Sequence, residues 1–146
     1  MLQSLRLALA ERRRQRIASR VSADAAAQRA RAGASLLDDE DPGWAARLDS
    51  RQLELADGQA CVLGQLHGDY RRGLFRSRVL NTSSAPSRFV SPVDLGFQAV
   101  SEGGPEAERL DYVFLTRAWR EEIRTRTDAT FAEDVTQGSR ATRRSA

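Results

Sequence analysis

The chain has 146 residues, of which 40% are hydrophobic and 29% are charged, and its formal net charge is +3. This length predicts one domain with one hydrophobic core and argues against a multidomain enzyme. The apolar run Leu2–Ala10 is far shorter than a membrane span and is followed, not preceded, by its arginines, so we expect neither a membrane span nor a signal peptide. A single cysteine, Cys61, allows no intrachain disulfide, so we expect a cytoplasmic protein.

The basic residues are distributed unevenly along the chain. All 23 of them are arginines, a usage that a GC-rich genome produces without selection for guanidinium chemistry. Residues 1–34 contain eight arginines against two acidic residues, whereas residues 35–50 contain one arginine against five. The positive charge is therefore concentrated at the N-terminus, where a basic helix can meet phosphates, an acidic protein surface or only water.

The first 34 residues have the composition of one long helix. They are rich in alanine, arginine, glutamine and leucine, they lack proline, and their one glycine, Gly33, lies near the end. We therefore predict a helix over residues 1–34. Its apolar residues recur at helical spacings and form one narrow stripe that Arg13 interrupts. The stripe consists of Leu2, Leu5, Leu9, Ile17, Val21 and Ala25.

This narrow stripe has three interpretations. The helix can pack across the core of its own domain, with Arg13 extending into water. It can instead form a coiled coil or dock on a partner protein, or it can bind nucleic acid. The stripe is too short to decide among the three. We expect four of its residues to be buried against protein: Leu5, Leu9, Ile17 and Val21.

A turn and short elements are predicted after this helix. Acidic residues followed by a proline and a glycine indicate a turn. We then expect a short helix that carries Trp44 and Leu48 inward and has Asp41 as its cap. Leu53 and Leu55 alternate with polar neighbours, which is typical of a short extended segment and allows a minor strand pair.

The most apolar stretch of the chain is Gln59–Leu66, which we predict to be a buried helix. Gly68 is a candidate C-cap for it, and Asp69–Phe75 predicts a further short helix. Residues 81–104 contain two prolines with several serines and glycines, so we expect an irregular loop there. The apolar residues of this loop expected to contact the core are Phe89, Val93, Leu95 and Phe97.

A last helix is predicted from residue 106 to about residue 127, with a wide apolar face. The composition then shifts to threonine, serine, glycine and arginine, so we expect a disordered tail at 128–146. The chain is therefore predicted to be mainly α-helical, with a basic N-terminal helix at 1–34 and a helical core domain at 35–127. The large apolar residues expected to meet in the core are Trp44, Leu63, Leu66, Phe97, Phe114 and Trp119.

The chain offers few residues for catalysis or metal binding. Cys61 and His67 are each the only residue of their kind, and their spacing places them on different sides of a helix, so they form no local nucleophile pair. We expect Cys61, between two apolar residues, to be buried and unreactive. One cysteine and one histidine are too few for zinc, and no glycine pattern is typical of nucleotide binding. We therefore expect a non-enzymatic protein with no catalytic residue, no metal and no cofactor.

A more specific pattern surrounds the cysteine, where residues 61–70 read CVLGQLHGDY. Apolar and small residues complete this pattern on both sides: Pro42-Gly43-Trp44, Leu48-Asp49, Leu53, Leu55, Leu74, Leu95-Gly96-Phe97, Leu115-Thr116, Ala118-Trp119 and Ile123. Over residues 36–126 the chain resembles small uncharacterised proteins of actinobacteria and their phages. The resemblance implies a shared core and an actinobacterial or phage source. It implies no activity, cofactor or catalytic residue, and it does not extend to the N-terminal helix or the tail.

Together these observations favour an interaction or assembly protein, located in the host cytoplasm or in a virion. Its partner would be another protein or a second copy of itself, bound through the N-terminal helix. The alternative is a small nucleic-acid-associated or regulatory protein, in which arginines spread around the helix contact phosphates without reading base edges. The candidate contact residues for either partner are Arg12, Arg13, Arg14, Arg16 and Arg20.

Overall fold

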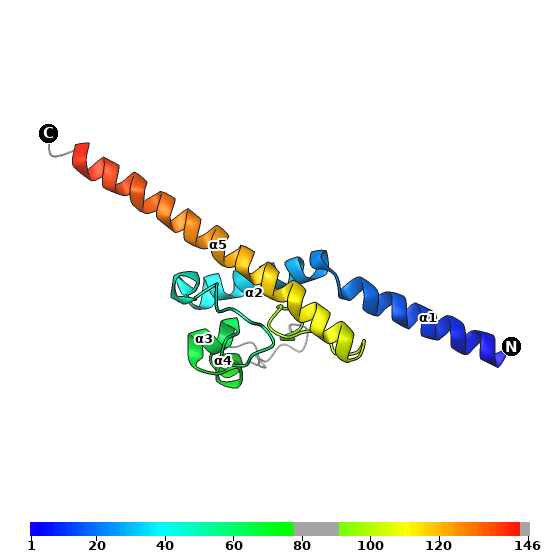
Figure 1. Ribbon diagram of the computed structural model, residues 1–146. Helices are drawn as coiled ribbons and strands as arrows, with labels where there is room; N and C mark the ends of the chain where they lie inside the picture. Colours follow the sequence, from blue (N-terminus) through cyan, green and yellow to red (C-terminus); the bar gives the residue numbers. More distant parts are fainter. Residues whose placement is uncertain (78–90, 144–146) are drawn as a thin grey trace, which may run out of the picture.

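The structure, a computed structural model, describes residues 1–77 and 91–143 and is helical throughout its regular parts (Figure 1). Its elements are α1 (Leu2–Arg20), α2 (Ala23–Glu40), the 3₁₀-helix η1 (Trp44–Arg47), α3 (Val62–His67), α4 (Tyr70–Arg76) and α5 (Pro105–Arg143). The mainly α-helical class is thereby confirmed. Among the described helices, none combines the length and apolar character needed to cross a membrane.

The prediction of a minor strand pair is wrong, because the described residues contain no strand. Leu53 and Leu55 lie instead in a run of turns, and their backbone groups bond to side chains of α5. The Leu55 N–H donates to Thr116 Oγ1 at 3.1 Å, and Arg120 Nη2 donates to the Leu53 carbonyl at 2.9 Å. These bonds satisfy the backbone as strand pairing would, while both leucine side chains are buried.

The long N-terminal helix predicted over 1–34 is also wrong, because two helices occupy this region. The interruption lies at Ser22, whose extended backbone (φ −151°, ψ 161°) starts α2. Ser22 Oγ accepts a hydrogen bond from the Ala25 N–H at 3.1 Å, and Asp24 lies in the first turn, where an acid is favourable. This cap ends one helix and begins another within a segment whose composition favours helix throughout.

Small residues allow α2 to approach α5 and the segment before it closely. A Cβ atom added to Gly33 would lie 2.1 Å from the Leu95 carbonyl oxygen and 2.8 Å from the Trp119 ring, so only glycine fits there. α2 thus belongs to the core, and within the first 40 residues only the chain up to Arg20 projects from it (Figure 1). The buried residues of α2 are Ala26, Ala30, Gly33, Ala34 and Leu37.

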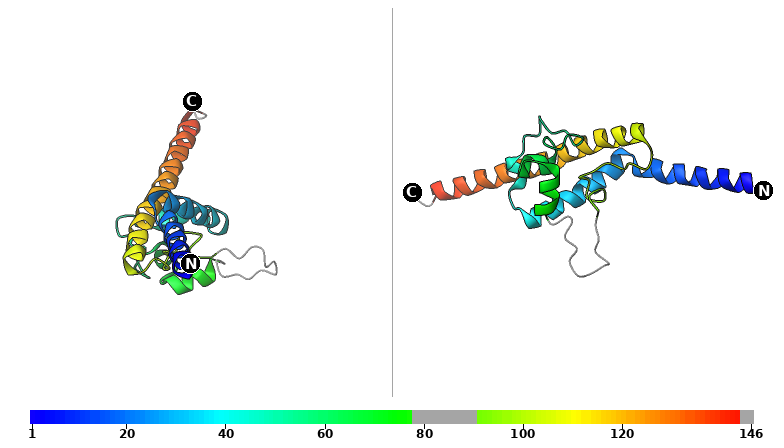
Figure 2. Two further views of the ribbon diagram at one scale, coloured as in Figure 1. Left: turned by 90° about the vertical axis from the view of Figure 1, so that its right-hand side faces the viewer. Right: turned by 90° about the horizontal axis from the view of Figure 1, so that it is seen from below.

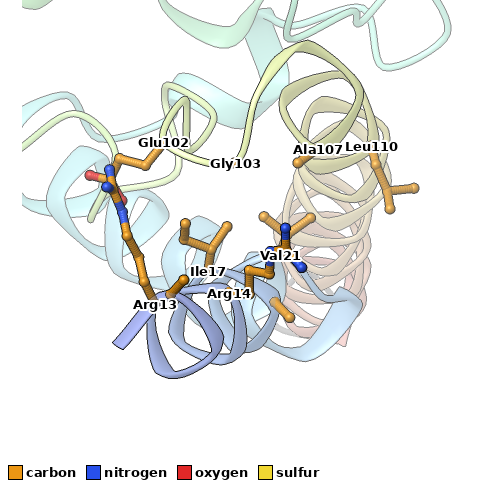
Figure 3. A pocket seen from close by; sticks show the side chains of 10 residues that line it. Arg13, Arg14, Ile17, Val21, Glu102, Gly103, Ala107 and Leu110 are labelled. Atoms are coloured by element: carbon orange, nitrogen blue, oxygen red, sulfur yellow. The ribbon is translucent and has the colours of Figure 1, made fainter. Parts of the chain in front are cut away.

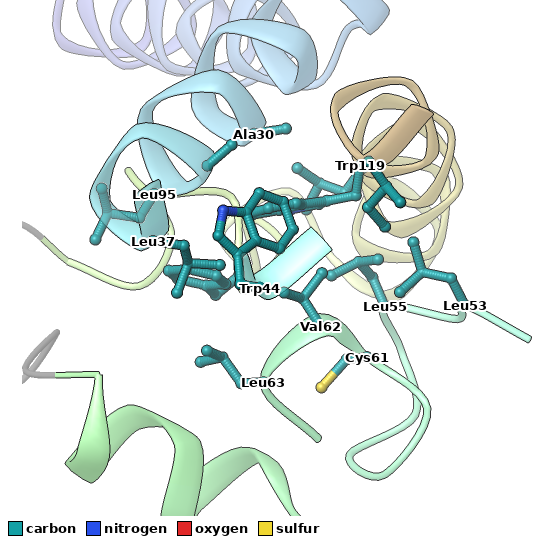
Figure 4. Packing of buried hydrophobic residues seen from close by; sticks show 14 of the residues in the cluster. Ala30, Leu37, Trp44, Leu53, Leu55, Cys61, Val62, Leu63, Leu95 and Trp119 are labelled. Carbon is teal, nitrogen blue, oxygen red and sulfur yellow. The ribbon is translucent and has the colours of Figure 1, made fainter. Parts of the chain in front are cut away.

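The core is centred on the Trp119 ring of α5 (Figure 4). Trp44 meets this ring edge-on at 5.7 Å between centroids, and Phe97 stacks on it at 5.2 Å. The indole N–H of Trp119 donates to the Gly96 carbonyl at 2.6 Å, so the buried ring leaves no polar atom unpaired. Trp44, Phe97 and Trp119 are therefore confirmed as core residues. So is Leu63, whereas Leu66 and Phe114 pack at the margin of the cluster and are only partly buried.

Three consecutive caps, at Cys61, Gly68 and Asp69, delimit the short helices beside this core. Cys61 begins α3, since its Sγ accepts from the Gly64 N–H at 3.3 Å, so the helix starts at Val62 and not at the predicted Gln59. Gly68 ends α3 with a positive φ of 95°, as predicted. Asp69 then caps α4 by accepting from the Arg72 N–H at 2.8 Å. Both predicted short helices exist here, with shifted ends.

A buried ion pair and a surface cluster connect α2 to α5. Asp111 is buried on α5 and accepts from Arg29 Nη2 at 2.5 Å and from the Val100 N–H at 2.8 Å. Near the other end of α2, Asp38 accepts from the Trp44 indole at 2.8 Å and from Arg126 at 2.7 and 2.8 Å. These contacts fix the position of α2 along α5.

The last predicted helix is too short, because α5 continues beyond residue 127 to Arg143. The segment expected to form the tail is helical up to Arg143, while residues 144–146 lie outside the described residues. All the side chains described from 128 to 139 are exposed. In the expected loop, Leu95 and Phe97 are buried and Val93 is half-buried, and Phe89 lies outside the described residues.

Candidate interaction surface on the N-terminal helix

The surface singled out by the sequence, α1, projects from the core at one end of the molecule (Figures 1 and 2). None of its 19 residues is buried. Its four leucines, at positions 2, 5, 7 and 9, are between 58% and 75% exposed. The predicted burial is therefore wrong within this chain for Leu5 and Leu9, while Ile17 and Val21 are half-buried.

The C-terminal part of α1 is attached to the core by one tight contact and by ion pairs. Ile17 lies so close to the Gly103 turn that a Cβ atom on that glycine would be 2.8 Å from Ile17 Cγ2. Arg20 donates to Glu102 at 3.1 Å and lies 4.0 Å from Asp94. The start of α1 has no comparable contact among the described residues, so its leucines face water in a single copy of the chain.

The five predicted contact arginines divide into two groups. Arg20 is occupied by its ion pairs and is half-buried, so it anchors the helix. Arg12, Arg13, Arg14 and Arg16 are exposed, and none of them forms an ion pair within the described residues. These four guanidinium groups are therefore available to a partner.

A pocket of about 540 Å³ separates α1 from the beginning of α5 (Figure 3). Its walls are mainly apolar, with two arginine side chains and one glutamate at its edge. The lining residues are Ala10, Arg13, Arg14, Ile17, Ala18, Val21, Glu102, Gly103, Ala107 and Leu110. The sequence did not predict this pocket. Its walls come from α1 and from the start of α5, and these two segments lie far apart in the chain.

The apolar and basic residues of α1 are separated along the helix axis more than around it. The leucines occupy residues 2–9, and five of the six arginines occupy residues 12–20. An amphipathic helix lying on a membrane carries an apolar face along its whole length, and α1 does not. Its pattern instead fits a partner that offers an apolar contact followed by negative charge.

A second projecting surface was not predicted from the sequence. The distal part of α5, residues 127–139, extends from the opposite end of the molecule (Figure 2). Phe131 is 74% exposed and Val135 is 59% exposed, and they share one face because they are four residues apart. The segment contains the acids Asp128, Glu133 and Asp134 and no basic residue. Its threonines and glycine had suggested a tail, but the spacing of Phe131 and Val135 was a readable signal of a helical face.

Cys61 and His67 lie at the two ends of α3. Cys61 is buried, as predicted, and burial raises the pKa of its thiol. His67 ends α3 and is half-buried, and its partial burial lowers the pKa of the imidazole. Within 1–77 and 91–143, no three acidic, cysteine or histidine side chains gather in a group that could hold a metal ion.

Comparison with known proteins adds no assignment to this geometry. No protein-family model, curated protein or solved structure matches the chain.

Proposed function

We propose that the protein is a non-enzymatic assembly protein that associates through α1, in the simplest case with a second copy of itself. The observation that carries this proposal is that no residue of the 19-residue helix α1 is buried, although it has four exposed leucines near its start. Large apolar side chains that remain in water usually mark an interaction surface. The resemblance around CVLGQLHGDY supports an actinobacterial or phage source, and with it a role in the host cytoplasm or in a virion.

The energetics of a free helix support the same proposal. Helices gain most of their stability in proteins from packing an apolar face, and an isolated helix of about 12–15 residues is marginal in water. In a single copy, residues 2–16 of α1 bury nothing that could stabilise them. A protein surface that covered the leucines would supply roughly 25 cal/mol for each Å² of apolar area removed from water.

The test measures the mass of the full chain in solution over a range of concentrations, by light scattering after size exclusion. The wild type is expected to exceed the 16.2 kDa of one chain. The double variant Leu5→Asp/Leu9→Asp is expected to remain at that mass, because charge on the stripe prevents burial.

Leu7→Asp is the matched control, since Leu7 is equally exposed but lies on another side of α1. It is expected to assemble like the wild type. Circular dichroism checks that all variants fold. A wild type that stays monomeric, or assembly that survives Leu5→Asp/Leu9→Asp, would contradict the proposal.

One observation favours nucleic-acid binding as a second candidate function: Arg12, Arg13, Arg14 and Arg16 are exposed without an ion pair among the described residues. A random DNA duplex titrated at two salt concentrations tests it. Micromolar binding that weakens steeply with salt would favour this function, and no binding at low salt would exclude it. Arg12→Gln/Arg16→Gln should weaken binding, whereas Arg109→Gln, an exposed arginine on α5, should not.

A further inference from the structure

The two projecting helices are complementary to each other. α1 carries six arginines and one glutamate. The distal part of α5, residues 127–139, carries three acidic residues and no basic residue. Each also exposes apolar side chains, Leu5 and Leu9 on one helix and Phe131 and Val135 on the other. A pair of α1 helices would instead bring two strongly positive surfaces together, which is unfavourable.

The two helices cannot meet within one chain. They project from opposite ends of the molecule, and Figures 1 and 2 show both running along its long axis in the same sense. Turning a second copy end for end therefore places α1 of each copy beside the distal α5 of the other, antiparallel to it. Such a two-fold arrangement uses both surfaces twice and closes on itself.

We propose that the protein forms this antiparallel dimer, in which α1 docks on the distal α5 of a second copy. The inference rests on the proposed function, because it names the partner surface for α1. With Leu9 beside Val135, an antiparallel register sets Arg16 near Asp128 and Arg13 opposite Phe131. Leu9 then meets Val135 and Arg16 faces an acid of α5, while the aliphatic part of the Arg13 side chain covers Phe131.

The outer side of α5 is accessible for this contact. By helical spacing, Phe131 and Val135 point away from the side on which Trp119 and Ile123 enter the core. The short helices α3 and α4 lie on the core side of α5 (Figure 1). Docking on Phe131 and Val135 therefore requires no rearrangement of the core.

A complementation experiment tests the pairing with two variants of the full chain. The first is Leu5→Asp/Leu9→Asp, which is defective in α1, and the second is Phe131→Asp/Val135→Asp, which is defective in distal α5. Each alone is expected to sediment as a monomer, with a dimer Kd raised by more than about tenfold. Mixed in equal amounts they are expected to form a heterodimer, because one of its two contacts joins an intact α1 to an intact α5.

The control for the second variant is Gln137→Asp, which adds one negative charge on the other side of distal α5 and is expected to leave the dimer intact. Raising the salt concentration is expected to weaken the wild-type dimer, because the exposed charges are screened. Circular dichroism and the melting temperature of each variant verify that it folds.

The outcomes separate this inference from the proposed function. If Leu5→Asp/Leu9→Asp abolishes assembly but Phe131→Asp/Val135→Asp does not, or if the mixture forms no heterodimer, the α5 docking surface is wrong and assembly through α1 stands. If the wild type is monomeric, or the α1 variant assembles normally, both are overturned.

Discussion

The two halves of α5 have the same secondary structure but opposite environments. Between Asp111 and Ile123 the helix buries five side chains against the rest of the fold, whereas between residues 128 and 139 it buries none. α1 and α2 show the same contrast on the N-terminal side, since only α2 contributes to the core. An apolar face on a helix therefore indicates burial without indicating which molecule covers it.

The largest effect is expected where α5 enters the core. Trp119→Ala should lower the free energy of unfolding by about 3–5 kcal/mol, because it removes the ring on which Trp44 and Phe97 pack. Phe131→Ala, the matched aromatic truncation on distal α5, should change the unfolding of the monomer by less than about 0.5 kcal/mol. Denaturant unfolding at a concentration where the chain is monomeric measures both.

Equal losses in these two variants would remove the distinction between core and projecting helix. The same conclusion would follow if deletion of residues 138–146 lowered the melting temperature as much as Trp119→Ala does.

Breaking the buried ion pair should have the next largest effect on the free energy of unfolding. Asp111→Ala leaves the Arg29 guanidinium and the Val100 N–H without their buried acceptor, which should cost about 3–5 kcal/mol. Glu106→Ala, which removes an exposed acid on the same helix, should cost less than about 0.5 kcal/mol. Unfolding curves that coincide for the two variants would show that the contact between α2 and α5 does not depend on this pair.

The close packing of α2 predicts that Gly33→Ala causes a smaller loss of folding stability. Gly33→Ala should destabilise the fold by about 1–3 kcal/mol, since its Cβ would overlap the Leu95 carbonyl and the Trp119 ring. Gly138→Ala on distal α5 meets no neighbouring atom within 4 Å and should stabilise the helix, by up to about 1 kcal/mol. Thermal unfolding should therefore move in opposite directions for the two, and a shared direction would contradict the contrast.

The smallest effect concerns pH and the surface cluster of Asp38. The hydrogen bond from Arg126 holds the pKa of the Asp38 carboxyl below its ordinary value near 4. Because the pKa is lower in the folded state, the stabilisation is complete above pH 4 and is lost as the pH falls through the folded pKa. The melting temperature of Asp38→Asn should thus fall less between pH 5 and pH 2 than that of the wild type. An identical fall in both would show that this carboxylate adds no acid sensitivity.

Sequence reasoning succeeded where local chemistry determines the structure. Gly68 and Asp69 predicted the boundary between α3 and α4, and the size of Trp44 and Trp119 predicted the core. It failed at Ser22, because a cap of one side chain is easily overlooked in a segment that otherwise favours helix. It also did not predict the helix after residue 127, where the composition is rich in threonine.

The interaction surface on α1 was only partly predictable, because a sequence pattern does not show which molecule covers it. The leucine stripe of α1 was visible in the sequence, but its periodicity is the same whether the cover comes from the same chain or another. The only sequence signal of the complementary surface at Phe131 and Val135 was their spacing of four residues, which does not by itself establish a helix. Its position opposite α1 depends on the tertiary arrangement, which no local pattern encodes.

The central claim is that the two projecting helices cover each other in the assembled protein. Hydrogen exchange of the wild-type chain, measured by mass spectrometry at increasing protein concentration, tests it most directly. Amides in residues 2–16 and 127–139 are expected to gain protection together, while those of the core helices stay protected at every concentration. Rapid exchange in both segments at all concentrations, or protection of α1 without distal α5, would contradict it.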